Sequence, residues 1–378
     1  MRVLFVSAGD EERASSRLRV FNMFPYLEDA GIEPSSFDPI RFAERVPGPE
    51  MFGLALSLVL LGLKAPRYDV VYVQKIPLPR LYVKILRVFT PVVYDFDDAL
   101  YTSPAWKDDD SKWKWLLDGS LEGASVVVAG SSILAEYAAD HAEVVHSLPT
   151  ALPRERYEAY DVAGCQSGTS PRDAEVEEVP PDEDSERRAG GTDESITLVW
   201  IGNPENLRYL EARSNAIAKV LDRNESARLR VVTAGELPVE PLRYRADVAY
   251  REWSLEEELD LLATADVGIR PLFDDEWTRG KGGFTSVVQM MALGLPVVIT
   301  PVSMLAELVV DGETGYHAST DEEWIADLER LIEDSDRRCA MGKAARNRID
   351  ESGFWTADRA AELVDIFQRL APTCEPDQ

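Results

Sequence analysis

The sequence predicts an α/β protein with two doubly wound lobes, because strand patterns and helix patterns alternate in two separate blocks. Short apolar runs typical of buried parallel strands occur in the first block at residues 2–7, 69–74, 91–94, 124–129 and 144–149. In the second block they occur at 196–201, 228–233, 250–253, 265–271 and 297–300. Each block should therefore form a parallel sheet covered by helices.

Helix patterns fill the intervals between these runs. We expect helices at residues 11–31, 78–88, 255–265, 284–293, 321–334, 336–350 and 355–370. The helix at 284–293 is ended by Gly294, Leu295 and Pro296, which are typical residues at such a stop. No repeat of 20 to 50 residues is visible, which excludes a solenoid.

Residues 161–194 separate the two blocks. This stretch holds eleven acidic and three basic residues and few apolar ones, so it buries too little surface to offset the entropy cost of ordering. We interpret it as a mobile loop or linker. The predicted parts of the chain are therefore a lobe at 1–160, the acidic linker at 161–194, a second lobe at 195–352 and a final segment at 353–378.

The chain of 378 residues has a net charge of −28, which argues against nucleic acid as a partner because phosphate backbones require basic patches. The chain holds 31 arginines, only 9 lysines and 68 acidic residues. Such a surface is typical of a halophilic protein, because molar salt screens the self-repulsion; an ordinary acidic soluble protein is the alternative. Three distant cysteines, Cys165, Cys339 and Cys374, argue against a disulfide framework or a zinc site. The apolar start is too short for a signal peptide, so we expect a cytoplasmic protein.

Residues 265–302 carry the strongest local pattern. A buried strand leads into a charged loop that holds Gly280, Gly282 and Gly283, and the expected helix follows. Glycine lets the backbone approach a ligand closely, and a helix that begins at a cationic glycine-rich turn favours an anion because of its free amides and its dipole. The sequence therefore predicts a phosphate-binding loop between a strand and a helix.

This segment resembles the donor-binding motif of the retaining GT-B glycosyltransferases of family 4, the glycosyl transferases group 1. The resemblance rests on MMALGLPVV at 290–298, AELV at 306–309 and DGETG at 311–315, in the order and spacing of the family. It implies a GT-B fold, in which two Rossmann-like doubly wound lobes face a cleft. The lobe at 1–160 would bind the acceptor, the lobe at 195–352 would bind the nucleotide sugar, and the helix in 353–378 would cross back to the first lobe.

The donor loop departs from the family at two glutamate positions, which here hold Lys281 and Gln289. Gln289 can still hydrogen-bond the ribose hydroxyls, whereas Lys281 would pair with phosphate. The family's diphosphate clamp, an arginine and a lysine after the first strand of this lobe, falls on Asn203 and Arg208, so we expect Arg279 and Lys281 to supply the missing charge; a surface helix position is the alternative for Arg208. The expected donor-site residues are Gly202, Asn203, Arg208, Arg279, Lys281, Gly282, Gly283, Phe284, Thr285 and Gln289, with Trp253 and Ser254 beside the base.

In the first lobe the resemblance indicates two substrate-contacting segments. Ser16 and Arg17 would touch donor phosphate or acceptor; the alternative is that Arg17 and Arg19 form a solvated helix face. In DFDDA at 95–99, Asp97 stands where the family has a cleft-facing histidine, so it would contact the sugar or an acceptor hydroxyl, and Asp98 would cap a helix or make a second contact. The same carboxylates could hold a divalent metal, as in GT-A enzymes, but the cationic donor loop makes a metal unnecessary and we expect none.

Residues 51–63 form the most apolar window of the chain. Thirteen residues are too few to span a hydrocarbon core, which needs about 20. This length favours a buried helix; the alternative is a segment that rests in a membrane interface beside a lipid-linked acceptor, aided by nearby cations. The nearby basic residues are Lys64, Arg67, Lys75, Arg80, Lys84 and Arg87.

Together these features predict a retaining hexosyltransferase of glycan biosynthesis that takes a nucleotide-diphosphate sugar and needs no cofactor. Arg208 and Lys281 would stabilise the departing diphosphate, and Asp97 would orient the sugar or the acceptor. The acceptor would be a glycan, a lipid-linked molecule or another hydroxyl. In the alternative in which 51–63 rests in a membrane interface, 51–87 would make peripheral contact with the inner face of the membrane. Two alternatives stay open: a catalytically silent nucleotide-sugar-binding partner protein, and a GT-B-shaped nucleotide-sugar epimerase.

Overall fold

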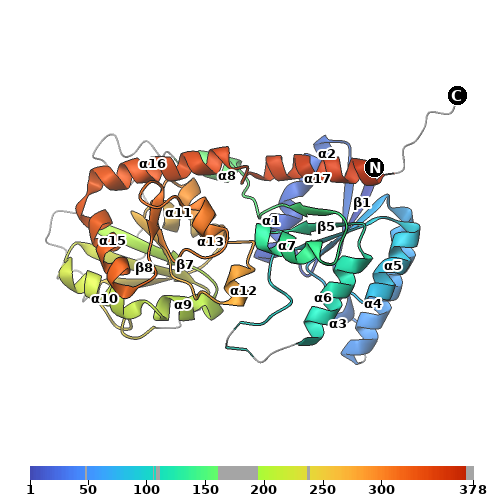
Figure 1. The fold of residues 1–378 in the computed structure, drawn as a ribbon, viewed down its shortest axis with the longest axis horizontal. Coiled ribbons are helices and arrows are strands. Elements are labelled where there is room, and N and C mark those ends of the chain that lie inside the picture. The colour runs from blue at the N-terminus through green and yellow to red at the C-terminus, as the bar shows by residue number, and fades with distance from the viewer. Residues whose placement is uncertain (47–48, 105, 108–110, 161–194, 236–238, 372–378) are drawn as a thin grey trace. The chain divides into compact units, whose positions relative to one another are not determined.

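The computed structural model describes residues 1–46, 49–104, 106–107, 111–160, 195–235 and 239–371 (Figure 1). The expected linker at 161–194 lies outside the described residues. The chain forms two compact units: unit 1 comprises Met1–Arg154, Asp274–Thr285 and Ser352–Gln378, and unit 2 comprises Glu155–Phe273 and Ser286–Glu351. The segment Asp274–Thr285, which the sequence prediction assigns to the second lobe, is thus part of unit 1.

Unit 1 is built around a six-stranded parallel sheet in the order β2-β1-β3-β4-β5-β6. Its strands are β1 (Arg2–Val6), β2 (Glu33–Phe37), β3 (Val70–Gln74), β4 (Val92–Phe96), β5 (Val126–Ala129) and β6 (Val145–Ser147). Its helices are α1 (Ala14–Arg19), η1 (Phe21–Met23), α2 (Phe24–Asp29), α3 (Pro39–Glu44), α4 (Glu50–Lys64), η2 (Ala65–Arg67), α5 (Arg80–Phe89), α6 (Ser111–Gly123), α7 (Ser132–Ala139), α12 (Glu276–Arg279) and α17 (Thr356–Leu370). The chain order of the strands reverses between β1 and β3, which makes this the switch point of the sheet.

Helices cover both faces of this sheet, and each face has its own apolar core. On one face α17 packs on α2, and the ring of Phe367 lies 6.1 Å from that of Phe5 and 6.0 Å from that of Tyr72. On the other face, Leu61 of α4 and Leu86 of α5 belong to the same apolar core as Tyr94 of β4. Figure 1 shows these two helices beside the sheet of unit 1. A sheet that is buried on both faces explains why its central strands are continuous apolar runs in the sequence.

Unit 2 holds a second six-stranded parallel sheet, in the order β12-β11-β10-β7-β8-β9. Its strands are β7 (Ile196–Ile201), β8 (Ala227–Thr233), β9 (Val248–Glu252), β10 (Val267–Arg270), β11 (Val297–Ile299) and β12 (Gly315–His317). Its helices are α8 (Glu155–Glu158), η6 (Pro204–Asn206), α9 (Leu207–Glu211), α10 (Ser214–Arg223), α11 (Glu258–Ala263), α13 (Thr285–Ala292, whose first residue is assigned to unit 1), α14 (Leu305–Leu308), α15 (Asp321–Glu333) and α16 (Ser335–Glu351). The switch point falls between β7 and β10, and ligands of doubly wound sheets bind outside the carboxyl ends of strands at such a point.

The structure confirms the predicted α/β class and all ten predicted strands. Two strands were not predicted: β2, an edge strand of sequence EPSSF, and the three-residue β12. The helix expected at 11–31 is interrupted, because the chain leaves helical geometry at Val20 and α2 begins afresh with Pro25 in its first turn. Gly31 does end this region, with a φ of 76° that suits glycine.

The apolar window at 51–63 lies in α4, but only one stripe of this helix is buried. Gly53, Ser57 and Leu61 face the rest of unit 1, whereas Met51 is 75% exposed and Leu63 is 61% exposed. The favoured prediction of a buried helix is therefore wrong. None of the helices in the described part of the chain is long and apolar enough to cross a membrane.

Candidate functional site

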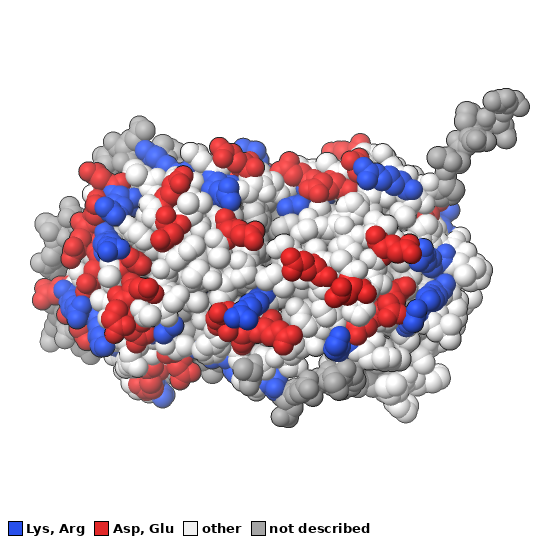
Figure 2. Space-filling model, viewed as in Figure 1, with Lys and Arg blue, Asp and Glu red and all other residues white. Residues whose placement is uncertain are grey.

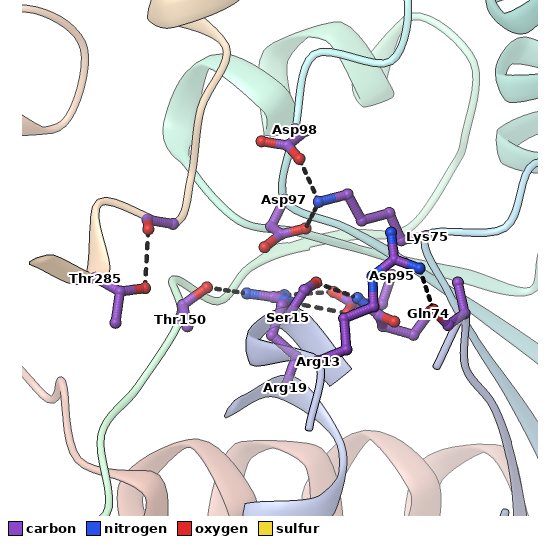
Figure 3. A network of polar contacts seen from close by, with 12 residues as sticks. Arg13, Ser15, Arg19, Gln74, Lys75, Asp95, Asp97, Asp98, Thr150 and Thr285 are labelled. Carbon is purple, nitrogen blue, oxygen red and sulfur yellow. Dashed lines mark hydrogen bonds and ion pairs between the residues drawn. The ribbon is translucent and has the colours of Figure 1, made fainter. Parts of the chain in front are cut away.

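The carboxylates at the end of β4 and directly after it are paired with cations in unit 1 (Figure 3). Asp95 is fully buried and binds the guanidinium of Arg19 through both oxygens, with an Nε–Oδ2 distance of 2.9 Å. Arg19 also donates to the carbonyl of Leu148 and to Oγ1 of Thr150, each at 3.1 Å. These bonds tie α1 to the ends of β4 and β6, so Asp95 is a structural member of this site.

Asp97 and Asp98 share one cation, the ammonium group of Lys75. The Lys75 Nζ atom lies 3.2 Å from Oδ1 of Asp97, and Lys75 also forms an ion pair with Asp98. Burial opposes the charged form of each group, but the two carboxylates raise the pKa of Lys75, and Lys75 and Arg19 lower the pKa of Asp97. Asp97 is therefore ionised at neutral pH, and a divalent metal would have to displace Lys75.

Asp98 does not cap a helix, contrary to one of its two expected roles. No described helix begins at Asp98, and the next one in the chain, α6, starts at Ser111. In the described part of the chain, no three His, Cys, Asp or Glu side chains are grouped so that they could hold a metal ion.

The glycine-rich segment at 280–283 lies against the end of β4. The amide of Gly282 donates to the carbonyl of Asp97 at 2.9 Å, and a Cβ atom on Gly282 would come within 2.3 Å of the backbone of Gly130. A Cβ atom on Gly283 would lie 3.3 Å from Oδ2 of Asp97. The structure thus brings together Asp97, Gly282 and Gly283, and only glycine fits at 282.

The other predicted residues of this segment flank these glycines. Arg279 is exposed and forms two hydrogen bonds with Asp274, at 2.6 and 3.0 Å. The Nζ atom of Lys281 lies 5.8 Å from the centre of the Trp277 ring, a cation–π contact. The Phe284 side chain is buried, and the Thr285 hydroxyl donates to the carbonyl of Gly283 at 2.9 Å. Arg279 thus already has a carboxylate partner, although exposed pairs of this kind exchange at little cost.

Two more predicted residues lie at the start of α1, close to the switch point of unit 1. Ser16 is fully buried, and Arg17, 8% exposed, donates to the carbonyls of Glu11 and Glu12 at 3.1 Å. The alternative of a solvated helix face is therefore wrong. The neighbouring Ser15 accepts a hydrogen bond at 2.8 Å from Gln74, the last residue of β3.

In unit 2 the residues expected to clamp the diphosphate lie after β7. Gly202 follows the strand directly, and Asn203 is exposed at the start of η6. Arg208 is partly exposed, and its Nε atom donates to the carbonyl of Glu205 at 2.9 Å. Of the two positions of the family's clamp, Asn203 is uncharged and only Arg208, in α9, carries a cation.

Gln289 belongs to a buried network that the sequence did not predict. Its amide nitrogen lies 3.3 Å from Oε1 of Glu258, which also binds Arg156 at 3.4 Å, and Oε2 of Glu258 accepts from Nε1 of Trp253 at 2.9 Å. Glu258 is only 4% exposed. In the sequence it stands in the acidic run EEELD, which reads as a solvated helix start, so its burial had no local signal. The network joins the expected ribose-side residue Gln289 to the expected base-side residue Trp253.

Comparison with known proteins identifies the type of domain. Residues 195–334 match the family described as glycosyl transferases group 1. The D-inositol 3-phosphate glycosyltransferase of Corynebacterium aurimucosum is 27% identical over 187 residues, which cover 45% of this chain and 42% of the relative. The corresponding protein of Corynebacterium jeikeium is 26% identical over 238 residues, which cover 57% of this chain and 54% of the relative. The chain thus spans about half the length of the curated relatives that it matches.

Solved structures match over almost the whole chain. The Anabaena protein HepE, solved in complex with UDP and glucose, has a TM-score of 0.69 at 15% identity and covers 98% of this chain and 100% of its own. Sucrose-phosphate synthase of Thermosynechococcus elongatus has a TM-score of 0.70 at 14% identity, with 98% of both chains covered. These likenesses, together with the two parallel sheets, confirm the predicted GT-B fold. Residues 195–334 therefore match the glycosyl transferases group 1 family, in a chain that has the GT-B fold.

Proposed function

We propose that the protein is a retaining glycosyltransferase that moves a sugar from a nucleotide diphosphate to a hydroxyl acceptor. The observation that carries the proposal is the family match of 195–334, the segment that holds Gly202, Arg208, Lys281 and Gln289. That its curated relatives are glycosyltransferases, and that HepE was solved with UDP and glucose, support this reaction and this donor class.

In the proposed reaction the bond between the anomeric carbon and the diphosphate oxygen breaks, and the acceptor oxygen bonds to the same face of that carbon. The acceptor loses its proton, and the nucleoside diphosphate leaves with the bonding electron pair. Arg208 and Lys281 would stabilise the negative charge that develops on the diphosphate. Asp97, kept ionised by Lys75, would accept a hydrogen bond from a sugar or acceptor hydroxyl and so fix its position.

The test is transfer of a radiolabelled sugar from UDP-glucose, UDP-N-acetylglucosamine and GDP-mannose, in molar KCl with EDTA, to a polar lipid extract. Label in the lipid fraction, lost in Asp97→Asn and Lys281→Ala, is the expected result, and NMR of the product should show an anomeric centre of the donor's configuration. Free labelled sugar without any acceptor would support the epimerase alternative instead. Binding of a nucleotide sugar with no turnover would support the alternative of a catalytically silent binding protein. That alternative is suggested by Lys281 and Gln289, which stand at the positions of the family's glutamates.

The acceptor side of the proposal includes peripheral contact with an anionic membrane through α4 and α5. These helices pack together, since the Tyr82 hydroxyl donates to the carbonyl of Leu58 and Thr90 donates to the carbonyl of Ala65 at 2.8 Å. Both bury one stripe in the same core of unit 1, so their other stripes face outward. We name this outer surface the α4–α5 face; its exposed large apolar residues are Met51, Phe52, Val59, Leu63, Leu81, Ile85, Val88 and Phe89.

The charge of this region is opposite to that of the chain. Between Met51 and Tyr94 the sequence has six basic residues and a single acidic one, Asp69, in a chain of net charge −28. Lys75 is the exception among the basic residues, because it is ion-paired with Asp97 and Asp98. Figure 2 shows red side chains over much of the visible surface, whereas the edge of unit 1 near α5 is mainly white and blue. Apolar side chains among exposed cations fit an anionic lipid surface.

Sedimentation with vesicles tests this contact. The protein should pellet with vesicles of phosphatidylcholine and phosphatidylglycerol, and the triple variant Leu81→Ser, Val88→Ser, Phe89→Ser should stay in the supernatant. Val144→Ser with Tyr244→Ser removes two exposed apolar side chains elsewhere and should bind like the wild type. Equal pelleting of the triple variant, or no pelleting of the wild type, would rule out the α4–α5 face.

A further inference from the structure

Arg270 is the last residue of β10, at the switch point of unit 2. β10 pairs in parallel with β7, with Val267 beside Leu198 and Gly268 beside Val199, so that Arg270 and Ile201 end the two strands side by side. From this point the chain order of the strands runs outward in both directions. A charged residue thus ends an otherwise apolar strand at the position where doubly wound sheets bind their ligands.

The guanidinium group of Arg270 is buried, and no residue in the described part of the chain is its counter-ion. The residue is 6% exposed; its Nη1 atom donates to the carbonyl of Ile201 at 3.2 Å, and its Nε atom has no hydrogen-bond partner among the described residues. No described carboxylate forms an ion pair with it, although the chain is strongly acidic. By contrast, buried Arg19 pairs with Asp95 and buried Arg359 pairs with Glu362 at 2.9 Å.

This arrangement costs free energy, because a buried charge loses its hydration. Burial lowers the pKa of Arg270 to about 10, against a smaller raising effect of Tyr209, which leaves it protonated at neutral pH but marks the loss of hydration. A buried charge of this kind gains most from an anion that brings its own hydrogen-bond acceptors. Gly202 gives the group its room, since a Cβ atom there would lie 3.3 Å from Nη1 of Arg270 and 2.8 Å from the ring of Trp200.

We propose that Arg270 binds the diphosphate of the donor nucleotide, and so supplies from β10 the cation that the loop after β7 lacks at Asn203. This inference rests on the proposed function, because it names the residue that holds the diphosphate of the same donor. The planar guanidinium can bind two oxygens of a phosphate group at once, which an asparagine cannot do. Because the group is already desolvated, the ligand has no hydration of Arg270 to remove, and the contact should be strong.

The test is calorimetric titration of UDP, UMP, uridine and inorganic pyrophosphate into the full-length protein, with ADP and GDP in parallel. Arg270→Met should weaken binding of UDP and of pyrophosphate at least about tenfold, the effect of losing a charged hydrogen bond, and should leave uridine binding unchanged. Arg270→Lys keeps the charge without the planar guanidinium. Its affinity for UDP and pyrophosphate should lie between those of the wild type and Arg270→Met. The matched control is Arg230→Met, because Arg230 also binds backbone and hydroxyl oxygens of unit 2, those of Leu261 and Thr264, away from the switch point.

The outcomes separate the two proposals. If the wild type binds a nucleoside diphosphate and both Arg270 variants bind it equally well, the role of Arg270 is overturned and the proposed function stands. If the wild type binds no nucleoside diphosphate at all, the proposed function fails, and the pyrophosphate titrations still decide whether Arg270 is an anion site. Should Arg270→Met unfold below the assay temperature, Arg270→Lys carries the test, and pyrophosphate affinity equal to that of the wild type would refute the inference.

Discussion

The backbone amide of Gly282 donates a hydrogen bond of 2.9 Å to the carbonyl of Asp97. This bond joins residues 185 positions apart and fixes the glycine-rich segment to the end of β4, inside unit 1. It places the backbone next to Lys281 beside the carboxylate that is ion-paired with Lys75. The hydrogen bond between Gly282 and Asp97 therefore fixes the position of the cationic segment within unit 1.

Gly282→Ala should break this contact. A Cβ atom would overlap the backbone of Gly130 at 2.3 Å, so the segment must shift, at a cost of about 1–3 kcal/mol. We expect a lower midpoint of urea unfolding and a loss of nucleotide-sugar turnover. The control is Gly62→Ala in α4. A Cβ atom there would lie 3.8 Å from its nearest neighbour, the hydroxyl of Tyr82, and the variant should raise stability by about 0.5–1 kcal/mol. If the two variants have the same urea midpoint and the same turnover, the close approach of Gly282 to Gly130 contributes neither to stability nor to activity.

Lys75→Met should leave Asp97 and Asp98 without their cation and destabilise the protein by about 3–5 kcal/mol at neutral pH. The added change Asp97→Asn should recover part of this loss.

The pH dependence of this ion pair has a defined sign. The pKa of Asp97 is lowered from 3.8, so its stabilisation is present above that pH and is lost as the pH falls through the lowered value. The pKa of Lys75 is raised from 10.5, so its contribution is lost only as the pH rises above that value.

Urea unfolding from pH 3 upward measures this pair. The difference in unfolding free energy between the wild type and Lys75→Met should be constant between about pH 5 and pH 9, outside both titrations, and should shrink in acid. If the difference in unfolding free energy stays the same down to pH 3, the ion pair between Lys75 and Asp97 does not stabilise the protein.

Gln289→Glu restores the residue of the family at that position, yet it should destabilise unit 2. The new carboxylate would lie about 3 Å from Glu258, as the present amide nitrogen does at 3.3 Å, and two buried like charges repel. We expect a loss of about 1–3 kcal/mol that grows as the pH rises above the ordinary glutamate pKa of about 4.3. The exchanged pair, Glu258→Gln with Gln289→Glu, should recover most of it in a double-mutant cycle. Without such recovery, the two side chains do not interact.

Asp274→Ala should release Arg279 from its exposed ion pair. If Arg279 contacts the donor, the affinity for UDP should rise a few-fold at low salt, and the gain should vanish in molar KCl because salt screens exposed charges. Asp334→Ala removes a similar exposed partner, that of Arg337, and serves as the control. An unchanged affinity at low salt would remove Arg279 from the donor site.

The elements that the sequence predicts are those with a strong local pattern. β1, β7 and β10 are apolar runs because both faces of their sheets are covered, and α13 follows from the glycines before it and the Gly-Leu-Pro stop after it. β2 was not predicted because an edge strand can be polar. Most of it is made up of Glu33, Pro34, Ser35 and Ser36.

The site was harder to predict, because its contacts join distant parts of the chain. Lys75 looks like one more member of a basic surface cluster, and only the fold brings it to Asp97. Glu258 looks solvated within an acidic run, and only the packing of α13 buries it beside Gln289. Arg270 did have a signal, since it is a charged residue at the end of an apolar strand, but that no described residue pairs with its charge is a property of the folded unit.

The packing of Phe367 on Phe5 and Tyr72 has a consequence for the order of folding during synthesis. The helix that carries Phe367 is translated after every strand of unit 2, although it covers the first strand of unit 1. The growing chain therefore contains every strand of unit 2 before α17 can cover its part of that face, beside α2. Chaperones that recognise apolar surface should therefore bind the growing chain at its amino-terminal part, and release it only when α17 has left the ribosome and packed on unit 1.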